Sequence, residues 1–174
     1  MTPTVASALE LIREVPDFPE PGVLFRDLGP VFANASAFRA LIGAMVDGLE
    51  PGTEVLVAVE ARGFLLGAAV AQAAGLGVVP VRKPGKTPLV AHRVEYALEY
   101  GTAALELPTD VLLPGQRALI VDDVLATGGT VAAAGKLVAA AGASVSGVSV
   151  VLELAALGGR NLLPGYPIHA LATL

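Results

Sequence analysis

One short stretch of the chain, residues 118–130, sets the strongest constraint on its fold. It begins with four apolar residues, Ala118 to Val121, continues with the carboxylates Asp122 and Asp123, and ends in a loop of small residues. An unbroken apolar run is typical of a strand buried on both faces of a parallel sheet. The alanine-rich segment from Val131 to Ala141 can return as the crossover helix. The stretch therefore predicts a strand, a loop at its carboxyl end and a helix.

The loop of this unit is Ala126-Thr127-Gly128-Gly129-Thr130, and its composition suits phosphate. Backbone N–H groups can point at a phosphate there, the glycines allow close approach, and the helix amino terminus adds partial positive charge. Carboxylates repel phosphate, so Asp122 and Asp123 suit ribose hydroxyls or the charge of a magnesium ion. A purely structural turn would also use Gly, Thr and Asp. Adjacent carboxylates directly after a buried strand are costly without a ligand, which favours a binding site.

Residues 118–130 resemble the ribose-phosphate signature of the type I phosphoribosyltransferases, in the form carried by members that act on adenine. The resemblance covers nearly the whole chain. It implies that the loop from Ala126 to Thr130 binds the 5'-phosphate of the phosphoribosyl group or of AMP. It also implies that Asp122 and Asp123 are catalytic residues that hold the ribose hydroxyls. The loop lacks the Gly-Lys-Ser/Thr ending of a P-loop, which excludes that class of site.

The segment from Phe18 to Asp27 is a proline-stiffened loop followed by a short apolar piece. It is similar to the adenine-pocket segment of the family, which would span about residues 18–30. The resemblance implies that Leu24, Phe25 and Arg26 bind adenine, with the Phe25 ring for stacking and backbone groups for the purine edge. Judged by residue type alone, Phe25 fits a core position better.

Two segments place positive charge after expected strands, in a chain of formal net charge −5. Arg62 follows the apolar run 55–59, and the cluster that contains Lys83 and Lys86 follows the next run. Ligands bind at the carboxyl edge of an open α/β sheet, and arginine offers bidentate hydrogen bonds to phosphate. The resemblance implies that Arg62, Lys83 and Lys86 bind pyrophosphate. Two other interpretations stay open, a surface pair between Arg62 and Glu60 and a solvated basic turn.

A lid is expected over about residues 86–101, ending in Leu98-Glu99-Tyr100-Gly101, which matches the family motif. A lid excludes water from a reacting ribosyl centre. The resemblance implies that Glu99 and Tyr100 are catalytic, Glu99 assisting the proton movements of adenine and Tyr100 lying against the reacting groups. Without the family, both residues fit a solvated hairpin arm. Residues 89–95 depart from the family pattern, so His92 receives no role.

Alternating apolar runs and helix-like segments predict a single α/β domain over residues 1–174. Its sheet is expected to be mostly parallel, doubly wound and flanked by helices, with the lid as an antiparallel hairpin. Strands are expected near 54–59, 77–81, 117–121, 145–152 and 168–172. Helices are expected near 4–14, 36–49, 63–75, 129–142 and 155–163.

Composition narrows the partners and the compartment. Apolar residues make up 54% of the chain, which favours a homodimer that covers part of its surface. The negative net charge does not indicate a surface that binds nucleic acid. Residues 64–81 are nearly uncharged, but glycines, Gln72 and Pro80 interrupt them, so no membrane span is expected. No signal-peptide pattern is evident and the cytoplasm is the expected location. The absence of cysteine excludes disulfides and thiol catalysis.

The predicted reaction transfers the 5-phosphoribosyl group from 5-phosphoribosyl-1-pyrophosphate to adenine, forming AMP and pyrophosphate, as in purine salvage. Mg²⁺ is expected as a cofactor carried by the substrate pyrophosphate, with no direct protein ligand. One alternative is the same reaction with another purine base, such as xanthine or hypoxanthine. The other is a non-catalytic nucleotide-sensing regulator on the same fold. Such regulators commonly need a DNA-binding domain, for which the roughly twenty residues before the base-pocket segment are too few.

Overall fold

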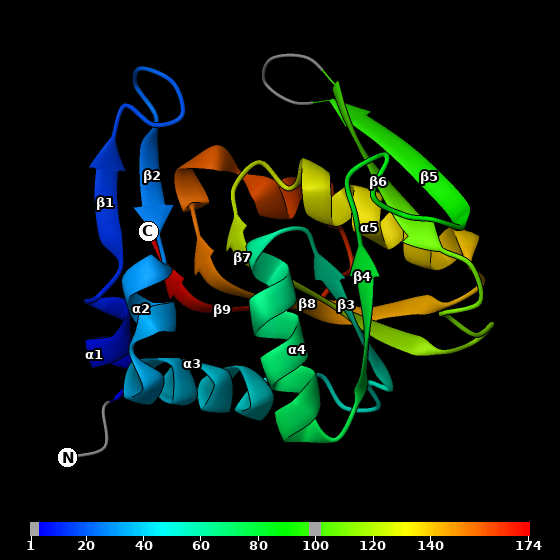
Figure 1. The fold of residues 1–174 in the computed structure, drawn as a ribbon, viewed down its shortest axis with the longest axis horizontal. Coiled ribbons are helices and arrows are strands. Elements are labelled where there is room, and N and C mark those ends of the chain that lie inside the picture. The colour runs from blue at the N-terminus through cyan, green and yellow to red at the C-terminus, as the bar shows by residue number, and fades with distance from the viewer. Residues whose placement is uncertain (1–3, 98–101) are drawn as a thin grey trace. The chain divides into compact units, whose positions relative to one another are not determined.

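The computed structural model describes residues 4–97 and 102–174 (Figure 1). The chain divides into two compact units, residues 1–44 and 45–174. The one phosphoribosyltransferase domain expected over residues 1–174 stays a prediction.

The first unit begins with a short helix and a small sheet. α1 (Val5–Leu9) is capped by Thr4, whose side chain accepts a hydrogen bond from the backbone N–H of Ser7. β1 (Arg13–Pro16) and β2 (Leu24–Asp27) then pair antiparallel. The helix expected over 4–14 was therefore wrong beyond Leu9. A proline disfavours helix in the residue before it, and β2 satisfies the backbone of this segment instead.

Two helices follow β2. α2 (Gly29–Ala33) was not predicted, and α3 (Ala35–Asp47) matches the helix expected near 36–49. The side-chain oxygen of Asn34 accepts hydrogen bonds from the N–H groups of Ser36 and Ala37, so Asn34 fixes the start of α3. The division between the two units falls within α3.

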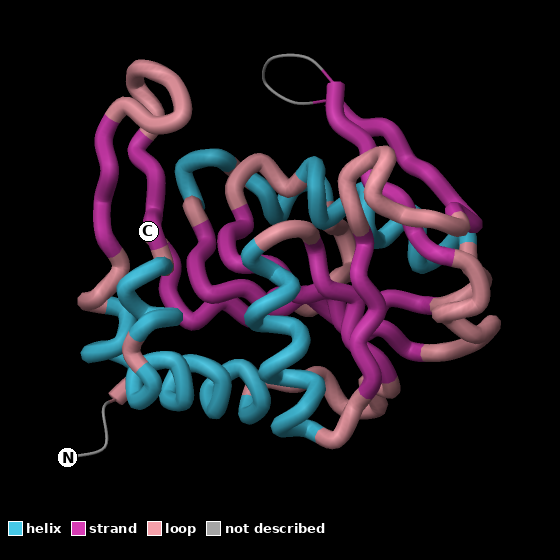
Figure 2. The backbone as a smooth tube through the Cα atoms, in the orientation of Figure 1, coloured by secondary structure: helices cyan, strands magenta, loops and turns pink. Residues whose placement is uncertain are grey.

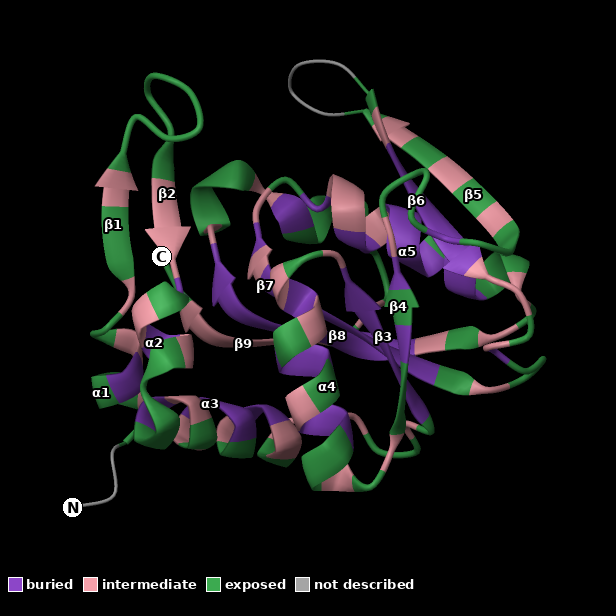
Figure 3. Cartoon of the chain, in the orientation of Figure 1, coloured by how far each residue is buried: buried purple, intermediate pink, exposed green. Residues whose placement is uncertain are grey.

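The second unit is built on a five-stranded sheet whose strands are all parallel (Figures 1 and 2). In order across the sheet the strands are β4 (Gly77–Val81), β3 (Val55–Val59), β7 (Arg117–Leu125), β8 (Ser144–Glu153) and β9 (Ile168–Thr173). This arrangement confirms the predicted parallel sheet, and all five expected strands are present. β3 is buried along its whole length, whereas β4 at the edge alternates between buried and exposed residues (Figure 3).

Two helices cover opposite faces of this sheet. α4 (Arg62–Ala74) connects β3 to β4, and its Gly67 lies against Ala58. α5 (Gly129–Ala140) connects β7 to β8 and shares a core cluster with Val57, on the other face of β3. The neighbours β3 and β7 thus lead away in opposite directions, to β4 and to β8. Their carboxyl ends mark the topological switch point, where ligands bind in doubly wound sheets.

Two boundaries near this edge differ from the sequence prediction. β7 runs to Leu125, so Asp122 and Asp123 lie inside the strand rather than after it. The reason is that β8 also extends and pairs with β7 as far as Leu125. The helix expected over 155–163 was wrong, because two short 3₁₀ helices, η1 (Ala155–Leu157) and η2 (Gly159–Leu162), occupy this segment. Gly158 separates them in the left-handed conformation, with φ of 65°, which a continuous α-helix does not allow.

A hairpin forms the antiparallel exception that the sequence predicted. β5 (Val90–Ala97) pairs antiparallel with β6 (Thr102–Pro108), and β6 lies beyond the expected end of the lid at residue 101. Leu105 and Leu107 of β6 join the core cluster of the sheet and α5. Among residues 4–97 and 102–174, no helix is long and apolar enough to cross a membrane.

Candidate functional site

A cavity of about 390 Å³ opens beside the carboxyl ends of β3 and β7. It brings together residues that the sequence analysis named separately, namely Arg62, Lys83, Asp122, Asp123 and Thr130. The other lining residues are Glu60, Ala61, Tyr96, Ala103 and Leu105. The volume is in the range of small-molecule sites, and its polar groups converge from several elements.

Asp122 and Asp123 form the acidic floor of this cavity and are only 8% and 5% exposed. Asp122 Oδ1 accepts a hydrogen bond from the backbone N–H of Asp123 at 2.9 Å. Burial raises the pKa of Asp122 well above its ordinary value, and the neighbouring charge of Asp123 raises it further. The site therefore favours a ligand that donates hydrogen bonds or brings positive charge to these carboxylates.

Arg62 is a cation that pairs with this acidic floor. Its Nε lies 2.8 Å from Oδ2 of Asp123, so the two side chains form an ion pair between α4 and β7. Within the described part of the chain no group donates a well-aligned hydrogen bond to this buried oxygen. A ligand hydroxyl would supply one. The sequence left open a surface pair between Arg62 and Glu60. In the structure Arg62 instead pairs with Asp123, and Glu60 has other partners.

Gly63 explains how α4 can approach the acidic pair so closely. A Cβ atom at this position would lie 2.9 Å from the carbonyl oxygen of Val121 and 3.2 Å from Oδ1 of Asp122. Only glycine avoids these contacts, so the first turn of α4 packs directly on the backbone of β7.

Glu60 organises the basic segment that follows β4. Its carboxylate accepts hydrogen bonds from the Lys86 Nζ at 2.8 Å and from the Lys83 backbone N–H at 2.7 Å. Burial alone would raise the pKa of Glu60, but these bonds and the nearby cations lower it below its ordinary value. Lys86 is therefore held by Glu60, whereas the side chain of Lys83 lines the cavity.

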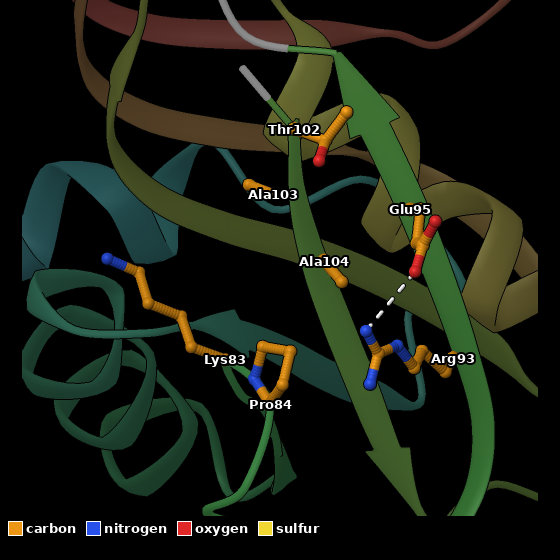
Figure 4. Close-up of a pocket in the computed structure, with 7 residues that line it drawn as sticks. All are labelled: Lys83, Pro84, Arg93, Glu95, Thr102, Ala103 and Ala104. Carbon is orange, nitrogen blue, oxygen red and sulfur yellow. Dashed lines mark hydrogen bonds and ion pairs between the residues drawn. The ribbon is translucent and has the colours of Figure 1, made fainter.

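Lys83 also borders a second hollow of about 320 Å³, which Pro84 and residues of both strands of the hairpin line (Figure 4). Arg93 and Glu95 of β5 form an ion pair along this strand at the wall of the hollow, with 3.2 Å between Nη2 and Oε1. Figure 4 shows the Lys83 side chain reaching away from this pair. Ala103 borders both hollows, so they lie next to each other along β6.

The predicted phosphate loop turns sharply between β7 and α5. Gly128 adopts a φ of 85° and precedes the first residue of α5. The loop and the adjoining ends of β7 and α5 line a hollow of about 50 Å³, through Val124, Leu125, Ala126, Thr127, Gly128, Thr130 and Val131. The first N–H groups of a helix have no partners within the helix, and α5 has no side-chain cap. The loop can therefore present backbone donors to one small anion.

The hairpin touches this loop through Tyr96, a residue that the sequence analysis missed. The Thr130 hydroxyl donates a hydrogen bond to the Tyr96 hydroxyl at 3.3 Å. A Cβ atom on Gly129 would lie 3.4 Å from the backbone oxygen of Ala97. The available signal was the alternation of β5, which turns Val94 and Tyr96 to the same face. Glu99 and Tyr100, the predicted catalytic residues of the lid, lie outside the described residues.

Comparison with known proteins identifies the family of the chain. A family model described as "Phosphoribosyl transferase domain" matches residues 35–160. The chain is 61% identical to the adenine phosphoribosyltransferase of Saccharopolyspora erythraea, over 96% of this chain and 91% of that protein. The chain belongs to the adenine phosphoribosyltransferase family.

Two solved structures of adenine phosphoribosyltransferases support the same placement. The enzyme from Thermoanaerobacter pseudethanolicus is 46% identical, with a TM-score of 0.95 over 98% of this chain and all of that one. The enzyme from Saccharomyces cerevisiae is 38% identical, with a TM-score of 0.91 over 97% of this chain and 98% of that one. The yeast structure holds adenine and an imino-altritol bisphosphate. The type I phosphoribosyltransferase fold predicted from the sequence is thereby confirmed.

In the first unit, the predicted adenine-binding residues Leu24, Phe25 and Arg26 follow one another on β2. Phe25 is half-buried, and the Phe18 ring meets it edge-on with 5.0 Å between ring centroids. Arg26 forms an ion pair with Glu14, its partner in the β1–β2 register. In this chain the segment is thus a two-stranded arm that carries an aromatic pair, and its role toward adenine stays a prediction.

Proposed function

We infer that this protein transfers the 5-phosphoribosyl group of 5-phosphoribosyl-1-pyrophosphate to adenine and releases pyrophosphate and AMP, a step of purine salvage. The observation that carries this inference is the cavity in which the acidic pair, Arg62 and the phosphate loop meet at the switch point of the sheet. Close relatives named adenine phosphoribosyltransferase support the choice of base.

The ribose phosphate is proposed to bind between β7 and α5. The backbone donors of residues 126–130 and the amino terminus of α5 hold the 5'-phosphate. Asp122 and Asp123 accept hydrogen bonds from the ribose hydroxyls. Their burial supports this role, as does the Asp123 oxygen that receives no well-aligned hydrogen bond from the described residues, because both features favour a hydrogen-bonding ligand.

In the reaction the bond between the anomeric carbon and the pyrophosphate oxygen breaks, and its electron pair leaves with pyrophosphate. A nitrogen of adenine forms the new bond to the anomeric carbon and loses its proton. Positive charge develops on the ribose while negative charge grows on the leaving group. Arg62, Lys83 and Lys86 are proposed to offset the negative charge. Glu99 is proposed to assist the proton movements of adenine, and Tyr100 to lie against the reacting groups.

Mg²⁺ is proposed to arrive with the pyrophosphate of the substrate. Within the described residues, no three His, Cys, Asp or Glu side chains lie together as a metal site. The negative charge of Asp122 and Asp123 can nevertheless balance a nearby magnesium ion whose ligands are water and phosphate oxygens. The bound ion would neutralise charge on the leaving group.

Two further properties concern assembly and location. A homodimer would cover exposed apolar side chains such as Leu65, which is 53% exposed. The cytoplasm remains the proposed location. Neither nucleic acid nor a membrane is proposed as a partner.

One experiment tests the reaction and the base together. The purified protein is incubated with 5-phosphoribosyl-1-pyrophosphate, Mg²⁺ and adenine, hypoxanthine, guanine or xanthine, and the products are separated by chromatography. AMP from adenine alone is expected. A different nucleotide would overturn the choice of base. Absence of product from every base, despite measurable binding of AMP, would favour the nucleotide-sensing regulator.

A further inference from the structure

The segment after β8 forms a backbone support for the phosphate loop. A Cβ atom on Gly128 would lie 2.4 Å from the backbone oxygen of Gly159. Conversely, a Cβ atom on Gly159 would lie 2.3 Å from the backbone oxygen of Ala126 and 3.1 Å from the nitrogen of Gly128. The two backbones are therefore in direct contact, and neither glycine has room for a side chain.

An ion pair anchors this support to the sheet. Arg160 directly follows Gly159, and its Nε and Nη2 donate hydrogen bonds to the two carboxylate oxygens of Glu153 at 2.5 and 2.7 Å. Glu153 is the last residue of β8, and its side chain is only 7% exposed. Hydrogen bonding to this carboxylate raises the pKa of Arg160 above its ordinary value.

The geometry of the pair restricts the segment more than a single contact would. A two-pronged pair between a guanidinium and a carboxylate fixes the orientation of both groups, which an ammonium cannot do. The backbone N–H of Leu154 also donates to the oxygen of Leu125 at 2.9 Å, which ties the end of β8 to the start of the loop. The segment that contains Gly159 is thus anchored to β8 through Arg160, while the backbone of Gly159 contacts the loop.

We propose that Arg160 and Glu153 are positioning residues for the 5'-phosphate loop. They hold Gly159 against Ala126 and Gly128, and so aim the backbone donors of the loop at the phosphate. Neither residue lines the cavity or the hollow of the loop. This inference rests on the proposed phosphate-binding role of residues 126–130. Its distinctive consequence is that loss of the pair weakens ligands that carry the phosphate and leaves adenine unaffected.

The test compares Arg160→Met, Arg160→Lys and Gly159→Ala with the wild-type protein. Loss of a charged hydrogen-bonded pair should raise the KM for 5-phosphoribosyl-1-pyrophosphate and the Kd for AMP by about tenfold. The KM for adenine should stay within twofold of wild type. Arg160→Lys keeps the charge but loses the two-pronged geometry, so it should resemble Arg160→Met.

Two matched controls separate this effect from general changes. Arg39→Met removes an exposed arginine from α3, and Gly43→Ala adds a methyl group where nothing lies within 4 Å. Both should leave every constant unchanged. A protein that is merely less stable loses active fraction and maximal rate, but it does not change the KM for one substrate selectively. If Arg160→Met folds poorly, the KM and Kd values of Arg160→Lys and Gly159→Ala are compared with those of wild type instead.

Equal changes for adenine and for the phosphate-bearing ligands, or no change in folded variants, would overturn the proposal. AMP binding is measured by calorimetry in the same series. A wild-type protein that binds AMP but forms none would count against the proposed reaction, while the ratio of Kd values would still decide the role of Arg160 and Glu153.

Discussion

The phosphate loop and the basic segment near Lys83 are held in place in different ways. The loop is fixed by backbone contacts, since Gly128 and Gly159 touch directly and α5 continues from it. The basic segment is held by side chains, because Glu60 binds both Lys86 and the N–H of Lys83. In the proposed reaction the 5'-phosphate stays bound throughout, whereas pyrophosphate must leave. A rigid backbone site suits the first group, and side chains that can exchange partners suit the second.

The largest effect is expected from the acidic pair between these regions. Asp123→Asn removes the charge that pairs with Arg62 and that is proposed to hold the ribose. Turnover should fall on the order of 100-fold or more, as for loss of a preorganised polar group at a reaction centre. The measurement is the initial rate at saturating substrates, with circular dichroism to verify folding. Asp47→Asn, at an exposed position in α3, is the control, and a rate for Asp123→Asn within twofold of wild type would remove the pair from the mechanism.

The rigidity of the loop is tested by Gly128→Ala. This change strains a residue with φ of 85° and also drives a methyl group into Gly159. Affinity for AMP should fall by about tenfold or more, because backbone strain of this kind costs on the order of 1–3 kcal/mol. Gly75→Ala is a matched control, since Gly75 also has a positive φ of 70° but meets nothing within 4 Å. If both variants bind AMP equally, contact with Gly159 does not matter to the loop.

The basic segment near Lys83 is tested by Glu60→Gln. The amide keeps an oxygen for the Lys83 N–H but removes the negative charge beside Lys86. Pyrophosphate should then bind more tightly, because one competing anion is gone. The gain should be only roughly threefold, because solvent around the partly exposed Lys86 screens its charge. The product-inhibition constant of pyrophosphate measures this. Glu54→Gln is the control, since Glu54 accepts the N–H of Arg117 at the opposite end of β3. Weaker pyrophosphate binding would show that Glu60 chiefly orders the cations.

The smallest effect concerns stability and pH. The pKa of Asp122 is raised in the folded protein, so the folded state binds this proton more tightly than the unfolded state. Stability from this group is complete below its ordinary pKa of 3.8 and is lost as pH rises through the higher folded value. Asp122→Asn should therefore make the ligand-free protein more stable at neutral pH, with a gain that shrinks toward pH 4. Denaturant unfolding at several pH values checks this, and a loss of stability at neutral pH would contradict it.

Much of this arrangement was predictable because its signals are local. Apolar runs identified the parallel strands, and the succession of Asp122, Asp123 and the glycine loop pointed to residues that line the candidate cavity and the small hollow beside it. Contacts between distant segments were not predictable in this way. The pairing of Arg62 with Asp123 depends on the strand order that places β3 beside β7. The capture of Lys86 by Glu60 depends likewise on the neighbouring strands β3 and β4.

The segment after β8 shows most clearly what local sequence patterns do not predict. Its composition fits a helix, yet Gly158 and Gly159 are used for a left-handed turn and for contact with the phosphate loop. Nothing in the local pattern reveals that Gly159 is needed to fit against Gly128, 31 residues earlier in the chain. The extension of β7 through Asp122 and Asp123 has a similar cause, since the length of β8 determines it.

The hydrogen bond between Tyr96 and Thr130 also has an optical consequence. The chain contains no tryptophan and three tyrosines, so no indole emission hides the phenol fluorescence. One of these phenols touches the first turn of α5, beside the loop proposed to hold phosphate. If the loop binds phosphate as proposed, the surroundings of a natural chromophore are expected to change on binding, so that tyrosine fluorescence of the unlabelled protein would follow its occupancy in real time.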